Sequence, residues 1–236
     1  MKFKFSFTLL ALFMSISAYS QVVRYSSLSE VSGLPYIILF DDDSEDSRIL
    51  YQHMTKLSTK VRDVSFMVIN YNNMSDKDKI RAKEMMIEGP SSFYIAWDIL
   101  DGGCALNKNF DLKYLKPLLV DLAELHRGIR LYRDGKYRIA KKKFVKIFGS
   151  KQLFFPEAAL YAGLCFQTER KFDIAANYFS EAGRLGLAEG LYQTGYYYET
   201  GKTSAGVQIE MARVMYEKAS RMGHERATIR LAGLRP

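Results

Sequence analysis

The stretch LHRGIRLYRDGKYRIAKKKFVKI (residues 125–147) returns further along the chain as LYAGLCFQTERKFDIAANYFSEA (residues 160–182). The glycines, alanines and aromatic residues keep the same offsets in both copies. The aligned pairs of glycine and aromatic residue are Gly128 with Phe144 and Gly163 with Phe179. Self-similarity over a period of this length is typical of helical repeat proteins, in which each repeat is one helix–turn–helix unit.

A third copy, LYQTGYYYETGKTSAGVQIEMARVMYEKA (residues 191–219), contains Gly195 and Tyr216 with a longer segment between them. The small residue in the first helix of each unit lets the second helix pack closely. The aromatic residue, flanked by small residues at helical spacing, faces the core. We therefore expect Phe144, Phe179 and Tyr216 to be buried. Each unit buries its face only against its neighbours, so the units stack into a right-handed solenoid, and Gly223 precedes a last, incomplete helix.

These spacings resemble tetratricopeptide repeats in the first two copies and the longer Sel-like repeat in the third. The resemblance covers residues 123–234 and departs from many such repeats at Gln152, where an inter-repeat proline is common. It implies a concave face that holds a peptide or protein partner. The candidate contacts are polar residues on the first helices, with one aromatic anchor: Arg127, Arg130, Arg133, Gln167, Gln193 and Tyr197.

The N-terminal half has a different pattern, in which short apolar runs alternate with helical stretches. Three runs rich in β-branched and aromatic residues predict buried strands over 34–40, 64–71 and 91–97. Helices are predicted over 48–59, 75–87 and 111–122. This order predicts a small sheet covered by helices.

The turn FDDDSEDSRIL (residues 40–50) joins the first of these strands to the first helix. Asp and Ser before a helix accept hydrogen bonds from its free N–H groups and suit the positive end of its dipole, so we predict a helix cap. A calcium site is the alternative for the acids, although the turn has no glycine and no Glu at EF-hand spacing. A hydrolytic serine would need a neighbouring base and an oxyanion hole. The acidic turn is also a candidate protein-contact surface.

Residues 30–122 resemble the thioredoxin fold. In that family a buried strand ends in a C-x-x-C motif at the start of the next helix, and a cis-proline that opens a later strand faces it. The alignment puts Ser44 and Ser47 at the cysteine positions, Pro90 at the proline, and Gly102-Gly103 at a hairpin turn. Thiol–disulfide exchange requires a thiolate and a resolving sulfur, so serines at these positions predict a redox-inactive domain.

The chain starts with a signal-like segment, MKFKFSFTLLALFMSISAYSQ. Two lysines precede a short apolar run and a small-residue cleavage site, which predicts a signal peptide over residues 1–20. An uncleaved anchor is the alternative, and a lipoprotein is not expected because no cysteine lies near the cleavage site. We expect export, most simply to the periplasm of a Gram-negative bacterium.

Charge separates the two halves. Residues 22–121 carry 12 Lys and Arg against 15 Asp and Glu, whereas residues 122–236 carry 20 against 11. This shift predicts domains over 22–121 and 122–236, and a protein partner that is acidic where it faces the repeats. Nucleic acid is not an expected partner of an exported chain, and membrane contact is expected to be indirect.

Cys104 and Cys165 fall in different predicted domains, and Cys165 has the pattern of a buried free thiol. Whether the two form a disulfide stays open at this point. The three histidines are scattered, so neither a metal nor another cofactor is expected.

Together these patterns predict an α/β thioredoxin-like domain followed by an all-α tetratricopeptide/Sel-like solenoid. We expect a non-enzymatic, exported protein–protein interaction scaffold. A chaperone-like holdase is the alternative, because a thioredoxin-like domain joined to helical repeats resembles the cytoplasmic chaperedoxins. The chain departs from those by its signal peptide and by the missing motif cysteines. A hydrolase is a third alternative, without a supporting histidine or metal cluster.

Overall fold

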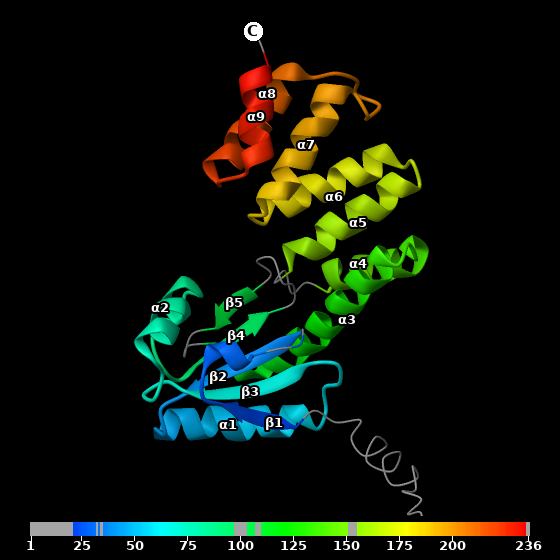
Figure 1. Ribbon diagram of the computed structural model, residues 1–236. Helices are drawn as coiled ribbons and strands as arrows, with labels where there is room; N and C mark the ends of the chain where they lie inside the picture. The colour runs from blue at the N-terminus through cyan, green and yellow to red at the C-terminus, as the bar shows by residue number, and fades with distance from the viewer. Residues whose placement is uncertain are drawn as a thin grey trace, which may run out of the picture. The chain divides into compact units, whose positions relative to one another are not determined.

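The computed structural model (Figure 1) describes residues 21–31, 33, 35–96, 103–106, 110–150 and 155–234. The predicted signal peptide, Trp97 of the third predicted strand, Gly102 and Gln152 lie outside these residues. The chain divides into two compact units, Met1–His126 and Arg127–Pro236. Among the described residues, none of the helices combines the length and the apolar character needed to cross a membrane.

The first unit is built on a five-stranded mixed sheet. The strands, in their order across the sheet, are β1 (Val22–Tyr25), β3 (Ser65–Asn70), β2 (Tyr36–Asp41), β4 (Ser92–Ala96) and β5 (Gly103–Leu106). The first three are parallel, whereas β4 runs antiparallel to β2 and β5 runs antiparallel to β4. The three predicted strands are present, and the two edge strands β1 and β5 were not predicted.

The central strands β2 and β3 are apolar on both faces because helices cover the sheet. In β2 the residues Ile37 to Phe40 are fully buried. The helix α1 (Glu45–Ser58) packs against β2. On one side of the sheet, Ile38 and Phe40 pack in a cluster that includes Ala82 of α2 (Asp76–Glu84). The short 3₁₀ helix η1 (Leu28–Glu30) lies between β1 and β2 in sequence, and η2 (Leu112–Tyr114) lies after β5.

A single helix, α3 (Leu115–Arg133), replaces the two separate helices that the sequence predicted. One apolar stripe continues along it at helical spacing without a break, and the residues of this stripe are buried: Leu115, Leu118, Leu119, Leu122, Leu125 and Ile129. The division between the two units therefore falls inside a continuous helix.

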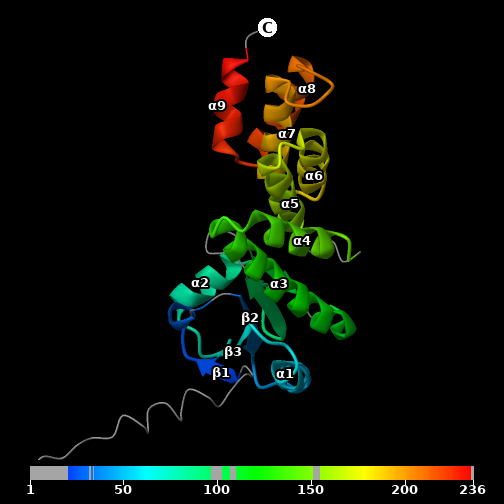
Figure 2. The ribbon, with the colours of Figure 1, turned by 90° about the vertical axis from the view of Figure 1, so that its right-hand side faces the viewer.

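The second unit is a run of helices in which each helix from α4 onward packs on the next (Figure 2). The helices are α4 (Tyr137–Phe148), α5 (Pro156–Thr168), α6 (Phe172–Arg184), α7 (Ala188–Thr200), α8 (Ile209–Arg221) and α9 (Glu225–Gly233). The helix predicted after Gly223 is thus confirmed as α9.

Each helix pair closes where a glycine of the first helix meets an aromatic ring of the second. A Cβ on Gly128 would lie 2.7 Å from Phe144 Cε1, one on Gly163 would lie 2.6 Å from Phe179 Cε1, and one on Gly195 would lie 2.8 Å from Tyr216 Cε1. The three rings are fully buried, as predicted. The glycines are therefore required by the approach of the rings, because a side chain at these positions would force the helices apart.

The extra segment of the third copy forms a loop between α7 and α8. It begins at Gly201, whose φ of +61° ends α7 in the left-handed region. The loop closes with a hydrogen bond from the backbone N–H of Gln208 to the carbonyl of Tyr198 (2.8 Å). Ser204 donates from its N–H and from its hydroxyl to Asp173 Oδ1 of α6, each at 2.9 Å. The insertion therefore contacts the preceding repeat.

Candidate functional site

The turn between β2 and α1 caps the helix, which confirms the predicted structural role of Ser44. The Ser44 hydroxyl accepts a hydrogen bond from the N–H of Ser47 (3.2 Å), and Ser44 has extended backbone angles typical of an N-cap. Glu45 and Asp46 occupy the first turn, near the positive end of the helix dipole. The serines at the aligned cysteine positions thus stabilise the start of α1.

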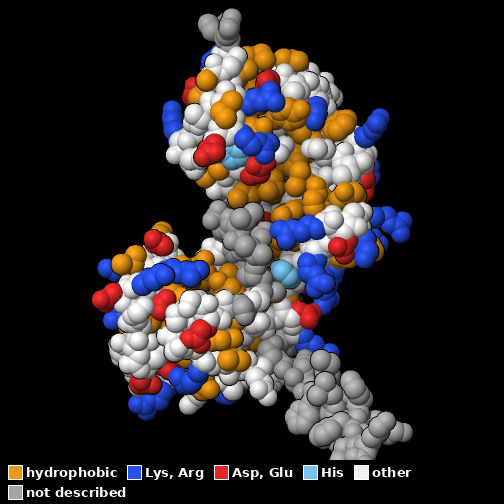
Figure 3. Space-filling view, viewed as in Figure 1, with side chains coloured by type: hydrophobic (Ala, Val, Ile, Leu, Met, Phe, Trp, Pro, Cys, Tyr) orange, Lys and Arg blue, Asp and Glu red, His pale blue; other side chains and the backbone are white. Residues whose placement is uncertain are grey.

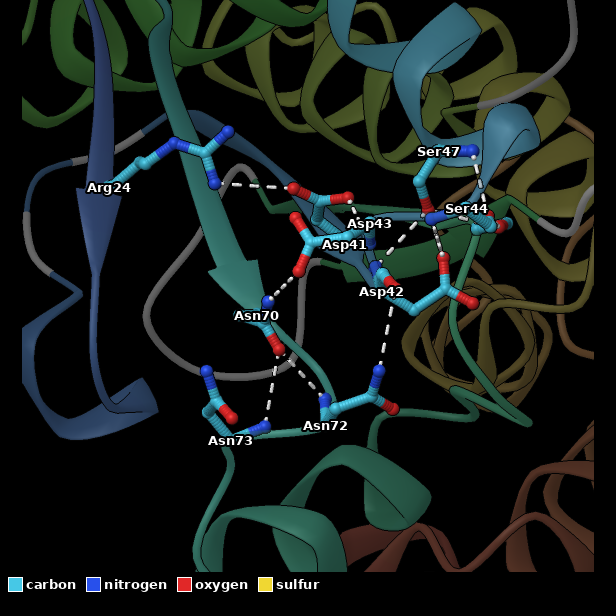
Figure 4. A network of polar contacts seen from close by, with 10 residues as sticks. Arg24, Asp41, Asp42, Asp43, Ser44, Ser47, Asn70, Asn72 and Asn73 are labelled. Carbon is cyan, nitrogen blue, oxygen red and sulfur yellow. Dashed lines mark hydrogen bonds and ion pairs between the residues drawn. The ribbon is translucent and has the colours of Figure 1, made fainter.

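Ser47 is buried and is hydrogen-bonded to Asp42 (Figure 4). Its hydroxyl donates to Asp42 Oδ1 (2.6 Å), and the N–H of Asp42 lies 3.3 Å from the same hydroxyl oxygen. Hydrogen bonds from Ser44 and Ser47 lower the pKa of the Asp42 carboxyl. A carboxylate with a lowered pKa is a weak base, so this arrangement does not activate the Ser47 hydroxyl as a nucleophile.

The neighbouring acids are held by groups from β1, from β3 and from the turn itself (Figure 4). Buried Asp41 accepts from Arg24 of β1 (3.2 Å) and from the N–H of Asp43 (3.0 Å). Asp43 has a φ of +64° and accepts from the side-chain amide of Asn70 of β3 (2.8 Å). These carboxylates therefore act as links between the turn and the sheet.

A third hydroxyl reaches the same turn from the segment before β4. Ser91, which follows Pro90, places its Oγ 3.0 Å from Ser47 Oγ and 3.3 Å from Ser44 Oγ. The N–H of Ser91 donates to the carbonyl of Phe40 (2.8 Å), which fixes the segment against β2. The structure thus brings Ser44, Ser47 and the Pro90–Ser91 segment together.

A pocket of about 660 Å³ opens beside these residues. Met86, Ile87 and Pro90 give it an apolar part, and Asp42, Asp46 and Glu88 give it an acidic border. Met86 is 77% exposed and has a φ of +62°. An apolar pocket with an acidic border suits an apolar side chain that has a basic neighbour. Among the described residues, no group of three or more His, Cys, Asp and Glu is placed to hold a metal ion.

In the second unit, Arg127, Arg130 and Arg133 are exposed on the last turns of α3. Their spacing of three residues puts them along one side of the helix. We call these three residues the arginine stripe. These are the predicted partner-binding residues that the structure leaves at the surface.

Tyr197 is buried, with an exposed fraction of 1%, so its prediction as an aromatic anchor on the surface is wrong. Its ring lies edge-on to Phe179 at 5.2 Å, and its hydroxyl donates to Gln167 Oε1 (2.9 Å). Burial raises the pKa of Tyr197 to about 12. Tyr197 belongs to the core cluster formed by α5, α6 and α7, and Gln167, which accepts a hydrogen bond from its hydroxyl, is half-buried.

Gln193 belongs to a network that the sequence did not indicate. It donates to Glu189 Oε1 (2.6 Å), and Glu189 Oε2 lies 2.8 Å from His224 Nε2. The other ring nitrogen of His224 accepts from the N–H of Ala227 and so caps α9 (3.2 Å). Glu189 and His224 are far apart in sequence, and only the packing of α7 beside the start of α9 brings them together.

Cations lie over tyrosine rings on α7. The Arg226 guanidinium is 4.2 Å from the ring centre of Tyr192, while Arg230 (5.3 Å) and Lys202 (4.6 Å) lie over Tyr196. In the view of Figure 3, hydrophobic side chains, a class that there includes tyrosine, gather over α5 to α7 with Lys and Arg at their border. A partner of this face would meet aromatic and cationic groups together.

Both cysteines are free thiols, Cys104 half-buried and Cys165 buried. Burial raises the pKa of the Cys165 thiol to about 12, which leaves it protonated and unreactive at neutral pH. Neither cysteine lies at the turn between β2 and α1.

Comparison with known proteins gives no family for this chain. No family model matches it, and no curated protein matches it.

Proposed function

We propose that the protein is an exported interaction scaffold. Its tetratricopeptide- and Sel-like solenoid (residues 122–236) holds a protein partner, and its thioredoxin-like domain (residues 22–121) has no redox activity and provides a second contact. The observation that carries the proposal is that, in each of three successive helix pairs, a glycine of the first helix meets a buried aromatic ring of the second. Helix pairs that are closed in this way, with each helix packed on the next, are the building units of solenoids that bind proteins.

The arginine stripe supports the choice of partner. Residues 122–236 hold 20 Lys and Arg against 11 Asp and Glu, and Arg127, Arg130 and Arg133 are exposed on α3. Such a surface attracts an acidic partner and speeds its encounter. The buried Tyr197 no longer belongs to the proposed contact surface, for which the arginine stripe and the half-buried Gln167 and Gln193 remain the candidates.

The thioredoxin-like part of the proposal is supported by the meeting of three hydroxyls. Ser44 and Ser47 lie at the start of the helix that follows a buried strand, and Ser91, next to Pro90, lies within 3.3 Å of both. This is the relation that the resemblance implies between the motif and the facing proline segment. The contacts of Ser47 are those of a structural residue.

Partner binding is tested by crosslinking in the cells that produce the protein. A photo-reactive residue at position 130 should trap one acidic protein in constant ratio, and the double variant Arg130→Glu, Arg133→Glu should lower its affinity by about tenfold, more at low salt than at high salt. The matched control is Lys142→Glu, Lys146→Glu, which makes the same charge change on exposed positions of α4.

An unchanged affinity in the arginine variant would remove the arginine stripe from the binding surface. A spread of unfolded clients in the crosslinks, with suppressed aggregation of a denatured protein, would replace the scaffold by the holdase.

The thioredoxin-like fold is tested by a gain of function. In a Cys104→Ser background, Ser44→Cys with Ser47→Cys places two thiols at a helix N-terminus, which favours the thiolate. We expect this variant to form the disulfide and to reduce insulin, whereas the natural sequence leaves insulin reduction at the uncatalysed rate. Insulin reduction by the natural sequence, or a pair of cysteines that never forms the disulfide, contradicts this part of the proposal.

A further inference from the structure

A second surface of the repeat unit lies on the second helices of the pairs rather than on α3. A groove of about 440 Å³ runs between α6 and α8, and Leu191 of the first turn of α7 lies in it. We call it the α6–α8 groove. Its residues come from the second and third repeats, so the groove exists only where two repeats are stacked.

The groove is hollow because Ser180 and Gly183, two of the residues of α6 that line it, are small. A Cβ on Gly183 would lie 2.8 Å from Leu191 Cδ2, and one on Gly190 would lie 2.5 Å from the backbone nitrogen of Gly183. The helices α6 and α7 therefore come unusually close here. Ser180, one turn earlier on α6, adds little volume, and the space above Leu191 stays unfilled.

The side of α8 that borders the groove carries apolar groups. Met215 and Met222 line it, and Met222 is 47% exposed. The adjoining side of α8 supplies the buried residues Ala212, Tyr216 and Ala219. Met215 is half-buried and packs near Gly195 of α7, where a Cβ would lie 3.2 Å from Met215 Cβ, whereas Met222 is exposed to solvent. Flexible thioether side chains at a surface adapt to apolar groups of different shape.

The border of the groove is cationic. Arg184, Lys218 and Arg221 line it. Arg184 pairs with Glu181 of its own helix (2.8 Å), and Arg221 lies 3.9 Å from Glu217. Within the described residues, Lys218 has no carboxylate at ion-pair distance. The three cations of the border outnumber the two carboxylates that pair with them, so the border carries a net positive charge.

We propose that the α6–α8 groove binds an acidic peptide segment of a partner protein and takes one of its apolar side chains between Leu191 and the two methionines. The cationic border complements the acids of such a segment, and a hollow lined by Leu and Met accepts an inserted side chain. An anionic membrane has the same charge, but it is bound by apolar groups that protrude, whereas these surround a hollow. This surface is separate from the arginine stripe on α3.

The test uses the purified protein and a fluorescein-labelled peptide of Glu and Asp with one central leucine. We expect saturable binding that weakens with salt. Lys218→Glu combined with Arg221→Glu should lower the affinity by about tenfold. The matched control, Lys142→Glu with Lys146→Glu, makes the same change in net charge on exposed positions of α4 and should bind as the natural sequence does.

The apolar part of the groove is tested separately. Replacing the central leucine of the peptide by alanine should weaken binding about fivefold, and Met222→Ala should reduce this difference between the two peptides. Met222 is half-exposed, so the variant should keep its fold, which circular dichroism checks. An equal loss of affinity in the α4 control would show that peptide binding depends on net charge alone, which would overturn the proposal. So would tighter, groove-dependent binding to phosphatidylglycerol vesicles, which would make the surface a membrane contact.

Discussion

The turn between β2 and α1 and the helix pairs of the second unit depend on contacts of different range along the chain. The turn is held by Arg24, Asn70 and Ser91, which reach it from three other segments of the sheet unit. Each helix pair is closed by one glycine and one ring within the same repeat. A change in a repeat should therefore act through packing, while a change at the turn should act through single hydrogen bonds.

The largest effect is expected from Gly163→Val. Its Cβ would lie 2.6 Å from the buried ring of Phe179, and the carbonyl of Ala175 would be 3.2 Å away, so neither neighbour can move freely. We expect a loss of about 3 kcal/mol in the free energy of unfolding, measured by urea titration of the helix signal.

The control for this change is Gly233→Ala in α9, where a Cβ meets nothing within 4 Å. It should stabilise slightly, because alanine favours a helix over glycine. A Gly163→Val protein as stable as the natural one would contradict the packing account of the repeats.

The next effect is a loss of stability in alkali. Burial raises the pKa of Tyr197 from 10 to about 12, so the folded state keeps the proton that the unfolded chain gives up first. Its stabilisation is complete below pH 10 and is lost as the pH rises from 10 through about 12. Tyr197→Phe should reduce this alkaline loss by about 2 kcal/mol, measured by urea titration across that range. An alkaline loss of the same size in the variant would exclude the tyrosine as its source.

At the turn, Ser44→Ala should lower the free energy of unfolding by about 1 kcal/mol in a urea titration, because α1 loses its N-cap. Ser44→Gly should lower it by less.

The pKa of Asp42 is lowered by hydrogen bonds from Ser44 and Ser47. A lowered pKa stabilises the fold above the ordinary value of 3.8, and this stabilisation is lost as the pH falls below it. A double variant, Ser44→Ala with Ser47→Ala, should therefore raise the pKa of Asp42 in an NMR titration, and an unchanged pKa would show that the serines do not hold the carboxylate.

The smallest effect is expected from Asp173→Ala, which removes the acceptor of the two hydrogen bonds from Ser204. Both bonds are exposed, so we expect a loss of about 0.5–1 kcal/mol in the thermal unfolding of the repeat unit. Asp173→Asn keeps an acceptor oxygen at the same place and should cost less than the alanine. Equal losses in the two variants would assign the effect to the charge of Asp173 at the start of α6 instead.

The repeats could be predicted because the glycines and aromatic residues that define them recur at fixed spacing along the sequence. The glycine and aromatic offsets of the first two copies are enough, by residue spacing alone, to place Gly163 opposite Phe179. The same periodicity misplaced Tyr197, since three consecutive tyrosines on α7 give no sign of which one faces α6. The apolar periodicity also continues along α3. Its leucines extend past residue 121, where the predicted domain boundary lies, and the two predicted helices therefore form one.

The turn was predicted only in its local part. The cap by Ser44 follows from residue type and position. The contacts of Asp41 with Arg24 and of Ser47 with Ser91 depend on the order of the strands across the sheet. The strands β1 and β5 have four residues each, too few for a pattern of alternation to be recognised.

Cys165 is a natural reporter of motion in the second repeat. Burial raises its pKa to about 12, so the thiol stays protonated at neutral pH while α5 is packed in place. An alkylating reagent can therefore modify this cysteine only during the moments when α5 separates from its neighbours. The rate of that modification, followed by mass spectrometry of the peptide that contains Cys165, measures how often the run of helices opens at α5.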